Sequence, residues 1–316
     1  MNLDNSIITV LMPVYNGESY LQEAIESILS QTFTNFEFLI IDDCSKDNSI
    51  NIINSFNDKR IKLVINKKNI GQSRTMNLGL MRAKGKYIAR IDQDDVSYNN
   101  RLESQINVIS GLNKTIIGTW AYTIDIESNI IGSIIHPIDN DSILDSLSLG
   151  SPFTHSSIFA EKKDLILLGG YSEKFKIAMD WDLWIKAASK NIQFCNIPEY
   201  LVGLRQHSNQ ASKDNKGKKT LNSETLKLFK KSKKYIKSKK NLNAFYGWSY
   251  YHQIINIRLN SNIVITLTKI IFSLLKPKYL INFLKLVFYH KLTSKPSNLY
   301  TPPILKKIYS SSFSSK

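Results

Sequence analysis

The stretch from Ile7 to Gly17, IITVLMPVYNG, begins as a continuous apolar run, Ile7–Met12, and ends in a polar turn. Three further runs rich in Ile, Val, Leu and Phe follow it at Phe36–Ile41, Ile61–Ile65 and Lys86–Ile91. Apolar runs of this length are typical of strands buried on both faces, as in parallel sheets. The first 110 residues are therefore predicted to contain four buried parallel strands.

Helical periodicity separates these runs. Between the first two, apolar residues recur at helical spacing, namely Tyr20, Leu21, Ala24, Ile25, Ile28 and Leu29. Further helices are predicted at about 47–56 and 72–83. Strands that alternate with helices indicate βαβ units, so we expect an α/β fold with a doubly wound, mostly parallel sheet flanked by helices.

Three polar clusters follow the predicted strands directly, at Pro13–Gly17, Asp42–Asp47 and Asp92–Asp95. In open α/β sheets, ligands bind beyond the carboxyl ends of the strands. The three clusters are therefore predicted to form one site at that edge of the sheet.

The rest of the chain is less regular. Residues 115–133 look strand-like and 139–149 helical, whereas 151–212 are expected to mix loops with a helix near 180–190. The polar, Lys-rich segment 213–240 is interpreted as a linker or a solvated helix. We expect one large domain over 1–212, with halves at about 1–110 and 111–212, and a basic helical C-terminal region over 213–316.

Charge is unevenly distributed along the chain. The formal net charge is +16, and residues 213–316 hold 22 of the 42 lysines and arginines but only two of the 26 acidic residues. Segments 263–276 and 278–292 carry their polar residues on one helical face, and neither reaches the roughly 20 apolar residues of a membrane span. We expect these basic amphipathic helices to lie on an anionic membrane; packing on the large domain or on a second subunit is the alternative.

Two features bear on the compartment. The N-terminus, Met-Asn-Leu-Asp, lacks the basic opening of a signal peptide, and Cys44 and Cys195 have no paired spacing. A disulfide framework and thiolate metal ligation are both disfavoured, which is typical of a reducing cytoplasm. We expect a cytoplasmic protein that is peripheral on the inner face of the cell membrane.

Asp92, Asp94 and Asp95 crowd three carboxylates into one loop. They repel one another unless a cation or hydrogen-bond donors neutralise them. Oxygen ligands suit Mg²⁺ or Mn²⁺, which also bind substrate phosphates. The alternative is an acidic surface turn or a helix N-cap, so this motif alone decides little.

Several motifs occur together in one order, and in that order the chain resembles the family 2 glycosyltransferases of the inverting GT-A fold. The likeness covers about residues 6–212. The motifs are Val10–Gly17 (VLMPVYNG), Ser30–Phe33 (SQTF), Ile41–Asp47 (IDDCSKD), Asn69–Gly71 (NIG), Asn77–Gly79 (NLG), Asp92–Asp95 (DQDD), Arg101–Glu103 (RLE), His155, Gly169–Tyr171 (GGY), Asp180–Trp184 (DWDLW) and Arg205–His207 (RQH).

The resemblance implies a set of nucleotide contacts. Those lining or bordering the nucleotide site would be Pro13, Tyr15, Asn16, Asp42, Asp43, Gly71, Arg74 and Asp92. Among them, Asp43 would accept a hydrogen bond from the base, Asp42 would brace its loop, and Asp92 would contact the ribose or the metal shell. Asp94 would ligate Mn²⁺ or Mg²⁺, with Asp95 and His207 as further candidate ligands.

The resemblance also implies that Asp180 is the catalytic base. The preceding residue is often Glu in the family but is Met179 here, so a supporting carboxylate is missing or is supplied by Asp182. Asp180 and Asp182 are both expected at the start of a helix; if that helix begins near Asp182, this carboxylate could cap it, with Asp180 in the preceding turn. His155, Trp181 and Arg205 are expected on the acceptor side or in supporting positions.

The implied reaction is transfer of a hexosyl or related sugar, with inversion, from a nucleotide-sugar to a glycan or lipid-linked acceptor. A UDP-sugar donor and a role in capsule or lipopolysaccharide assembly are expected, without nucleic acid as a partner. One alternative is a sugar-phosphate nucleotidyltransferase, but such an enzyme needs a Gly-rich phosphate loop with a basic residue, and no Lys or Arg precedes Lys46. Another is a non-catalytic basic protein that binds a membrane or nucleic acid, which would leave the carboxylate clusters without a role.

Overall fold

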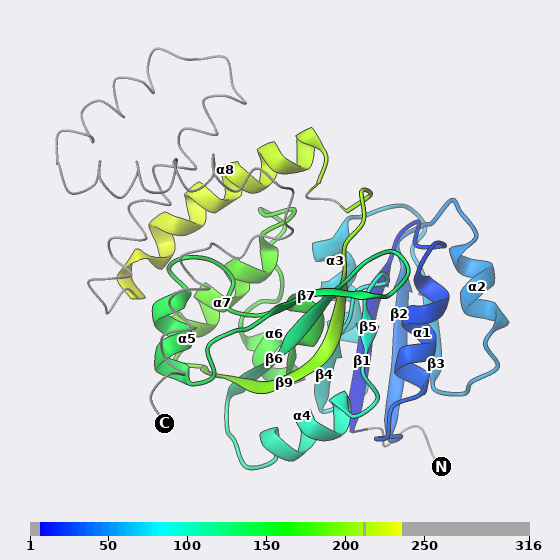
Figure 1. Cartoon of the computed structure of the whole chain (residues 1–316), viewed down its shortest axis with the longest axis horizontal. Coiled ribbons are helices and arrows are strands. Elements are labelled where there is room, and N and C mark those ends of the chain that lie inside the picture. Colours follow the sequence, from blue (N-terminus) through cyan, green and yellow to red (C-terminus); the bar gives the residue numbers. More distant parts are fainter. Residues whose placement is uncertain (1–6, 211–212, 236–316) are drawn as a thin grey trace. The chain divides into compact units, whose positions relative to one another are not determined.

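The computed structural model describes residues 7–210 and 213–235 (Figure 1). Residues 7–143 and 152–207 form one compact unit. Residues 144–151, together with 208–210 and 213–235, belong to a second unit. The functional residues predicted from the sequence all lie in the first, so the fold is described mainly for that unit.

Four parallel strands form the first part of the sheet in the order β3-β2-β1-β4. They are β1 (Ile8–Val14), β2 (Phe36–Asp42), β3 (Ile61–Ile65) and β4 (Tyr87–Arg90). All four were predicted within a few residues. The edge strand β3 is only half-buried, because it has a neighbouring strand on one side alone.

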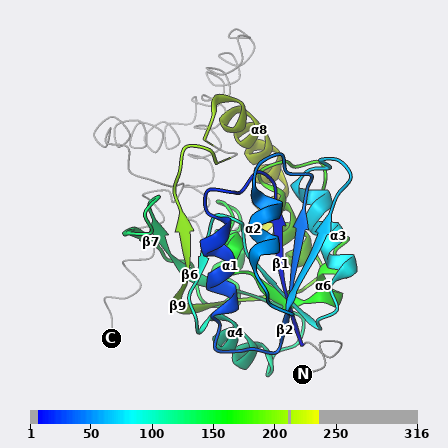
Figure 2. The same ribbon diagram turned by 90° about the vertical axis from the view of Figure 1, so that its right-hand side faces the viewer.

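Helices cover both faces of this sheet, with α1 and α3 on opposite sides (Figure 2). Strand residues Ile8, Val10 and Met12 face the core shared with α1 (Leu21–Leu29), α2 (Ser49–Ser55) and α4 (Arg101–Ile109). On the other face α3 (Gln72–Arg82) approaches so closely that a Cβ on Gly79 would lie 2.3 Å from the Leu11 side chain. The alternation of side chains along each strand therefore builds two apolar layers.

The second half of the sheet is mixed. It comprises β5 (Val96–Ser97), β6 (Thr115–Ile124), β7 (Ile130–Ile134), β8 (Phe159–Glu161) and β9 (Gln193–Arg205). β9 runs parallel to β6, while β8 pairs antiparallel with both β4 and β6 and joins the two halves. The expected doubly wound, mostly parallel α/β sheet is confirmed, with an antiparallel addition.

The expectation for 151–212 was wrong in one respect, because β9 is a 13-residue strand where loops were expected. Pro198 interrupts its apolar run, and the β6–β9 register shifts near that position. Because proline has no backbone N–H to donate to a neighbouring strand, a proline within an apolar run argues against a strand. For this reason β9 was not predicted.

The remaining helices of the first unit are short. They are η2 (His155–Ser157), α6 (Lys162–Leu167) and α7 (Met179–Ser189), while α5 (Asn140–Ser146) spans the boundary of the two units. In the second unit α8 (Asn215–Ser232) precedes η3 (Lys233–Tyr235), so the start of the Lys-rich segment is helical. Among the described residues, no helix is long and apolar enough to cross a bilayer. The amphipathic segments predicted at 263–276 and 278–292 lie outside the described residues.

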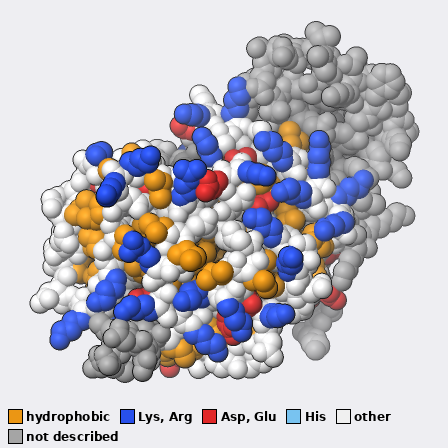
Figure 3. All heavy atoms as spheres, turned by 180° about the vertical axis from the view of Figure 1, so that it is seen from behind, with side chains coloured by type: hydrophobic (Ala, Val, Ile, Leu, Met, Phe, Trp, Pro, Cys, Tyr) orange, Lys and Arg blue, Asp and Glu red, His pale blue; other side chains and the backbone are white. Residues whose placement is uncertain are grey.

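The exterior of the first unit is less acidic than its sequence suggests. Its buried charged residues are seven carboxylates (Glu37, Asp42, Asp43, Asp95, Glu161, Asp164 and Asp182) and three arginines (Arg90, Arg101 and Arg205). Lys and Arg side chains are accordingly prominent on the face shown in Figure 3, with acidic groups sparser between them.

Candidate active site

The loops that follow β1, β2 and β4 meet at one edge of the sheet. This proximity results from the parallel pairing of the three strands, which brings Val14 opposite Asp42. Asn16 ties the first loop to the second: its backbone N–H donates to Ser45 Oγ at 3.0 Å, and its Oδ1 accepts from the Lys46 backbone at 2.8 Å. The polar clusters predicted to form one site are therefore adjacent.

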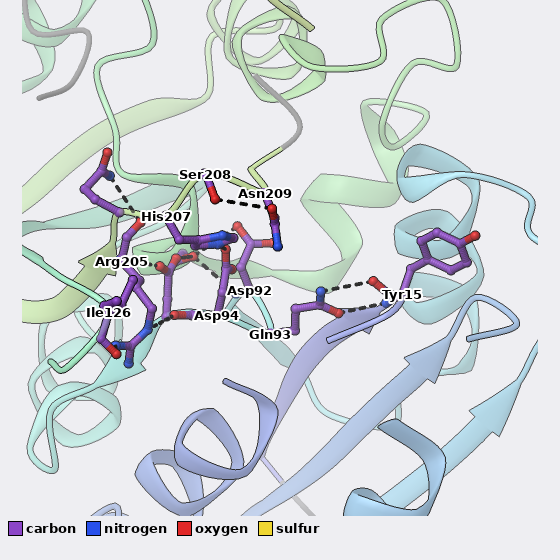
Figure 4. Close-up of polar contacts among 12 residues, drawn as sticks. Tyr15, Asp92, Gln93, Asp94, Ile126, Arg205, His207, Ser208 and Asn209 are labelled. Atoms are coloured by element: carbon purple, nitrogen blue, oxygen red, sulfur yellow. Dashed lines mark hydrogen bonds and ion pairs between the residues drawn. The ribbon is translucent and has the colours of Figure 1, made fainter. Parts of the chain in front are cut away.

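The three aspartates of the loop after β4 form one cluster. Oxygen atoms of Asp92, Asp94 and Asp95 all lie within 4.8 Å of one another. Asp92 and Asp94 are partly exposed, with side-chain exposures of 28% and 22%, whereas Asp95 is buried. Two carboxylates of the cluster, Asp92 and Asp94, are therefore accessible (Figure 4), while the third is buried.

Buried donors surround the cluster. Arg90 forms an ion pair with Asp92 and also donates to Ser156 Oγ at 3.1 Å. Ser156 in turn donates to both Asp92 and Asp95. Burial, together with the charge of Asp94, raises the pKa of Asp92 against the opposing effect of Arg90. Burial and the two neighbouring carboxylates raise the pKa of Asp95 well above its usual value.

Arg205 is the last residue of β9, and His207 lies two residues after it. Both contact the aspartate cluster. His207 Nε2 lies 2.8 Å from Asp94 Oδ2. The Arg205 backbone N–H donates to Asp95 Oδ1 at 2.9 Å, and its guanidinium donates to the Asp94 carbonyl at 2.9 Å. The same guanidinium pairs with Glu23 and lies 4.7 Å from the Tyr20 ring centre. Through the Asp94 carbonyl and the Asp95 carboxylate, Arg205 therefore fixes the shape of the aspartate loop.

The residues of the cluster fit a divalent cation. Crowding makes the carboxylates costly to keep charged, and a cation would relieve that cost. His207 Nδ1 is buried, and no described residue hydrogen-bonds to it. Carboxylate oxygens with one imidazole form a donor set that suits Mn²⁺, and Mg²⁺ is compatible with the oxygens.

Asp42 and Asp43, at the end of β2, hold the next loops in place. Asp42 Oδ2 accepts from the Ser45 backbone at 3.0 Å. Asp43 is buried and accepts from the Ile70 and Gly71 backbones at 2.9 and 2.8 Å, and from Asn66 at 2.8 Å. Gly71 precedes α3 with a φ of +87°, a conformation that favours glycine. Asp43 thus positions the entry to α3 as well as lying in the candidate nucleotide loop.

The other residues predicted to bind nucleotide differ in exposure. Pro13 is buried within β1, whereas Tyr15 is 45% exposed. Arg74 on α3 is exposed and pairs with Glu173 at 2.7 Å. Gln72, also on α3, donates to Asp92 at 3.4 Å, so the start of this helix lies beside the aspartate cluster.

Helix α7 begins at Met179, which agrees with the helix predicted near 180–190 and places its start before Asp182. Asp180 and Asp182 both lie in its first turn. The N-cap residue of α7 is Ala178, so Asp182 does not cap the helix; it is buried and pairs with Lys186 at 3.2 Å, one turn along. The Ser73 hydroxyl on α3 donates to the Met179 sulfur at 2.9 Å, and this contact joins the start of α7 to α3.

The pKa of Tyr171 responds to charges at the start of α7 and in the aspartate cluster. Burial is the main cause of the raised pKa of Tyr171, and both Asp180 and Asp92 raise it further while Arg90 opposes them. Its hydroxyl lies 2.9 Å from His155 Nε2. The charges of Asp180 and Asp92 thus act on the same phenol.

His155 and Trp181 are structural neighbours of this region. Burial and the positive charge of Arg90 lower the pKa of His155 well below its usual value, so the ring is neutral at pH 7. Trp181 and Trp184 are buried in the core. His155 also contacts the Trp184 ring edge-on, with ring centres 6.2 Å apart.

Residues 9–167, which are half of the chain, match the family model for glycosyl transferase family 2. The chain belongs to glycosyltransferase family 2. Uncharacterized glycosyltransferase RP339 of Rickettsia prowazekii (strain Madrid E) is 33% identical over 67% of this chain and 67% of its own. The putative glycosyltransferase EpsE of Bacillus subtilis (strain 168) is also 33% identical, over 64% of this chain and 73% of its own.

The fold of this glycosyltransferase is similar to that of S. aureus TarS (residues 1–349). The structure of this TarS fragment in complex with UDP superposes with a TM-score of 0.57 at 16% identity, covering 93% of this chain and 94% of the fragment. The complex with UDP-GlcNAc gives 0.57 at 15% identity, covering 87% and 89%. At such low identity the likeness establishes the fold, which is the GT-A architecture expected from the motifs.

Sequence reasoning missed four residues that contact the candidate site residues: Glu23, Arg90, Gln93 and Ser156. Arg90 and Ser156 gave a weak signal, because one is an arginine inside an apolar strand and the other follows His155. Glu23 and Gln93 gave none, since an exposed-looking Glu on a helix and a Gln between two aspartates have many roles. Their partners, Arg205 and Tyr15, are 182 and 78 residues away along the chain.

Proposed function

We propose that the protein transfers a sugar from a UDP-sugar to a glycan or lipid-linked acceptor, with inversion and with a divalent metal. The observation that carries the proposal is the aspartate cluster with His207, which adjoins the loops after β1 and β2. TarS has been solved with UDP and with UDP-GlcNAc, which supports a UDP-sugar donor on this fold.

The donor would lie over the carboxyl ends of β1, β2 and β4. In this arrangement the base contacts the loops with Pro13, Tyr15, Asn16, Asp42 and Asp43, and the sugar-phosphate part extends past Gly71 and Arg74. Asp92 would reach the ribose or the metal shell from the loop after β4. Parallel sheets bind nucleotides at this edge because successive loops converge there.

Asp94, Asp95 and His207 would hold Mn²⁺ or Mg²⁺. Asp94 and His207 are the stronger candidates, since both oxygens of Asp95 already accept hydrogen bonds from Arg205 and Ser156. A bound divalent cation supplies positive charge that offsets the negative charge of the leaving nucleoside diphosphate.

Asp180 would accept the proton of the acceptor hydroxyl as that oxygen attacks the anomeric carbon. A single displacement of this kind inverts the anomeric configuration. Asp182, already paired with Lys186, would stabilise the first turn of α7. His155, Trp181 and Arg205 would hold the surrounding structure in place.

We further propose that the acceptor is a cell-surface polysaccharide or its lipid-linked precursor, on the cytoplasmic face of the membrane. The basic composition of residues 213–316 supports contact with anionic lipid. The family match disfavours the two alternatives, a sugar-phosphate nucleotidyltransferase and a non-catalytic basic binder.

The direct test is UDP release from a panel of UDP-, dTDP- and GDP-sugars, with Mn²⁺, with Mg²⁺ and with excess chelator. Hydrolysis of the donor by water is expected even without acceptor, at a low rate that the chelator removes. Thermal shift with the same panel should identify the donor, because a ligand that binds only the folded state stabilises it. Absence of both binding and release across the panel would contradict the proposal.

Replacement of Asp43 by Ala is expected to weaken UDP binding by roughly 1.5–3 kcal/mol, the usual contribution of a charge-assisted hydrogen bond. Calorimetry measures the affinity, and thermal unfolding measures the cost of losing the bonds to Ile70 and Gly71. Asn66→Ala is the matched control, because it removes one donor to Asp43 and keeps the carboxylate. Unchanged UDP affinity in Asp43→Ala would refute this role.

A further inference from the structure

Gln93, the second residue of the Asp92–Asp95 motif, forms two hydrogen bonds with the backbone of one distant residue. The Tyr15 N–H donates to Gln93 Oε1 at 2.7 Å, and Gln93 Nε2 donates to the Tyr15 carbonyl at 3.1 Å (Figure 4). Tyr15 follows β1 and Gln93 follows β4. The primary amide therefore joins the loop of the candidate base site to the loop that carries the metal candidates.

A glutamine is well suited to this contact. Its amide offers one acceptor and one donor, which match the N–H and the carbonyl of a single residue. A glutamate at this position could only accept, and it would add a fourth negative charge to the cluster. An alanine could do neither.

Gly17 provides the space in which the Gln93 amide lies. A Cβ built on Gly17 would lie 2.7 Å from both Cδ and Oε1 of Gln93, closer than such atoms approach. A side chain at position 17 would therefore push the amide away from Tyr15. This is an independent sign that loop 13–17 is shaped around the Gln93 contact.

We propose that Gln93 is a positioning residue that sets the spacing between loop 13–17 and loop 92–95. The inference rests on the proposed function, in which one nucleoside diphosphate contacts both loops. A ligand that bridges two sites gains affinity when the sites are held at the matching distance beforehand. Loss of the Gln93 contact should therefore weaken a bridging ligand and leave a ligand of one loop unaffected.

The test compares UDP with saturating Mn²⁺, which contacts loop 13–17 and the metal candidates of loop 92–95, with uridine, which lacks the diphosphate and the metal and reaches loop 92–95 at most through the ribose and Asp92. Affinities are measured by calorimetry for UDP and by NMR titration for uridine. In Gln93→Ala we expect UDP to bind about tenfold more weakly and uridine to bind within about twofold of wild type. Gly17→Ala should give the same selective loss although it retains every atom of Gln93. Gln22→Ala is the control, since Gln22 is exposed on α1 and donates to Glu26 at 3.0 Å.

The outcomes separate the two proposals. A wild-type protein that binds neither UDP with Mn²⁺ nor uridine contradicts the proposed function itself. Wild-type binding with an unchanged ratio of UDP to uridine affinity in both Gln93→Ala and Gly17→Ala would overturn the positioning role alone. Equal weakening of both ligands would overturn it as well, because the substitution would then have damaged the base loop rather than its spacing.

Discussion

Replacing Asp94 with Ala is expected to abolish sugar transfer while the protein remains folded. The Asp94 carboxylate is partly exposed, and its hydrogen-bond partner among the described residues is His207. Its carbonyl, which accepts from Arg205, is untouched by the substitution. The charge of Asp94 also contributes to the raised pKa values of Asp92 and Asp95, so its removal relieves repulsion. Without added metal, the melting temperature should be equal to that of the wild type or higher.

Two further variants test whether the charge of Asp94 is what transfer requires. Asp94→Asn keeps the shape and a hydrogen-bonding group toward His207 but removes the charge, so it should also be inactive. Glu127→Ala, which removes an exposed carboxylate from the turn after β6, should retain full activity. Turnover is followed as UDP release across a Mn²⁺ titration. Near-normal turnover of Asp94→Ala at any point of that titration would show that Asp94 is not the ligand.

Replacing Asp180 with Asn is expected to lower turnover by a factor on the order of 10² or more, the typical contribution of a general base. Asn preserves the size of the side chain and the first turn of α7 but cannot accept the proton of the acceptor hydroxyl. UDP affinity should remain almost unchanged, because Asp180 is proposed to face the acceptor. Turnover and UDP binding are measured on the same preparation, so that a loss of donor binding is not mistaken for a loss of chemistry.

Asp182→Asn is the matched comparison. Residues two apart on a helix point about 200° away from each other, so Asp180 and Asp182 are unlike in their surroundings. The buried Asp182 carboxylate pairs with Lys186 at 3.2 Å, and its neutral replacement should lower stability by about 1–3 kcal/mol with a milder effect on turnover. An inactive Asp182→Asn beside an active Asp180→Asn would assign the base to Asp182.

The parallel core of the fold was predictable because its signal is local. β1, β2, β3 and β4 each lie in a short run rich in apolar residues, and the apolar residues between the first two repeat at helical spacing. Parallel strands need crossover helices, so the alternation of the two periods already implies the topology. β9 gave no such signal, since Pro198 breaks its run and its strand identity depends on pairing with β6.

The sequence by itself determined the sheet class, the three loops that meet at its edge, and the order of motifs that marks a family 2 glycosyltransferase. Only the tertiary structure decided how those motifs act on one another. Arg205 shapes the aspartate loop through the Asp94 carbonyl and the Asp95 carboxylate, and Gln93 reaches back to Tyr15. Contacts of this kind join residues that are 78 or more positions apart, and their energy depends on distance and burial. A sequence lists the donors and acceptors, whereas the fold brings particular pairs within 3 Å and removes them from water, where hydrogen bonds and charges have their largest effect.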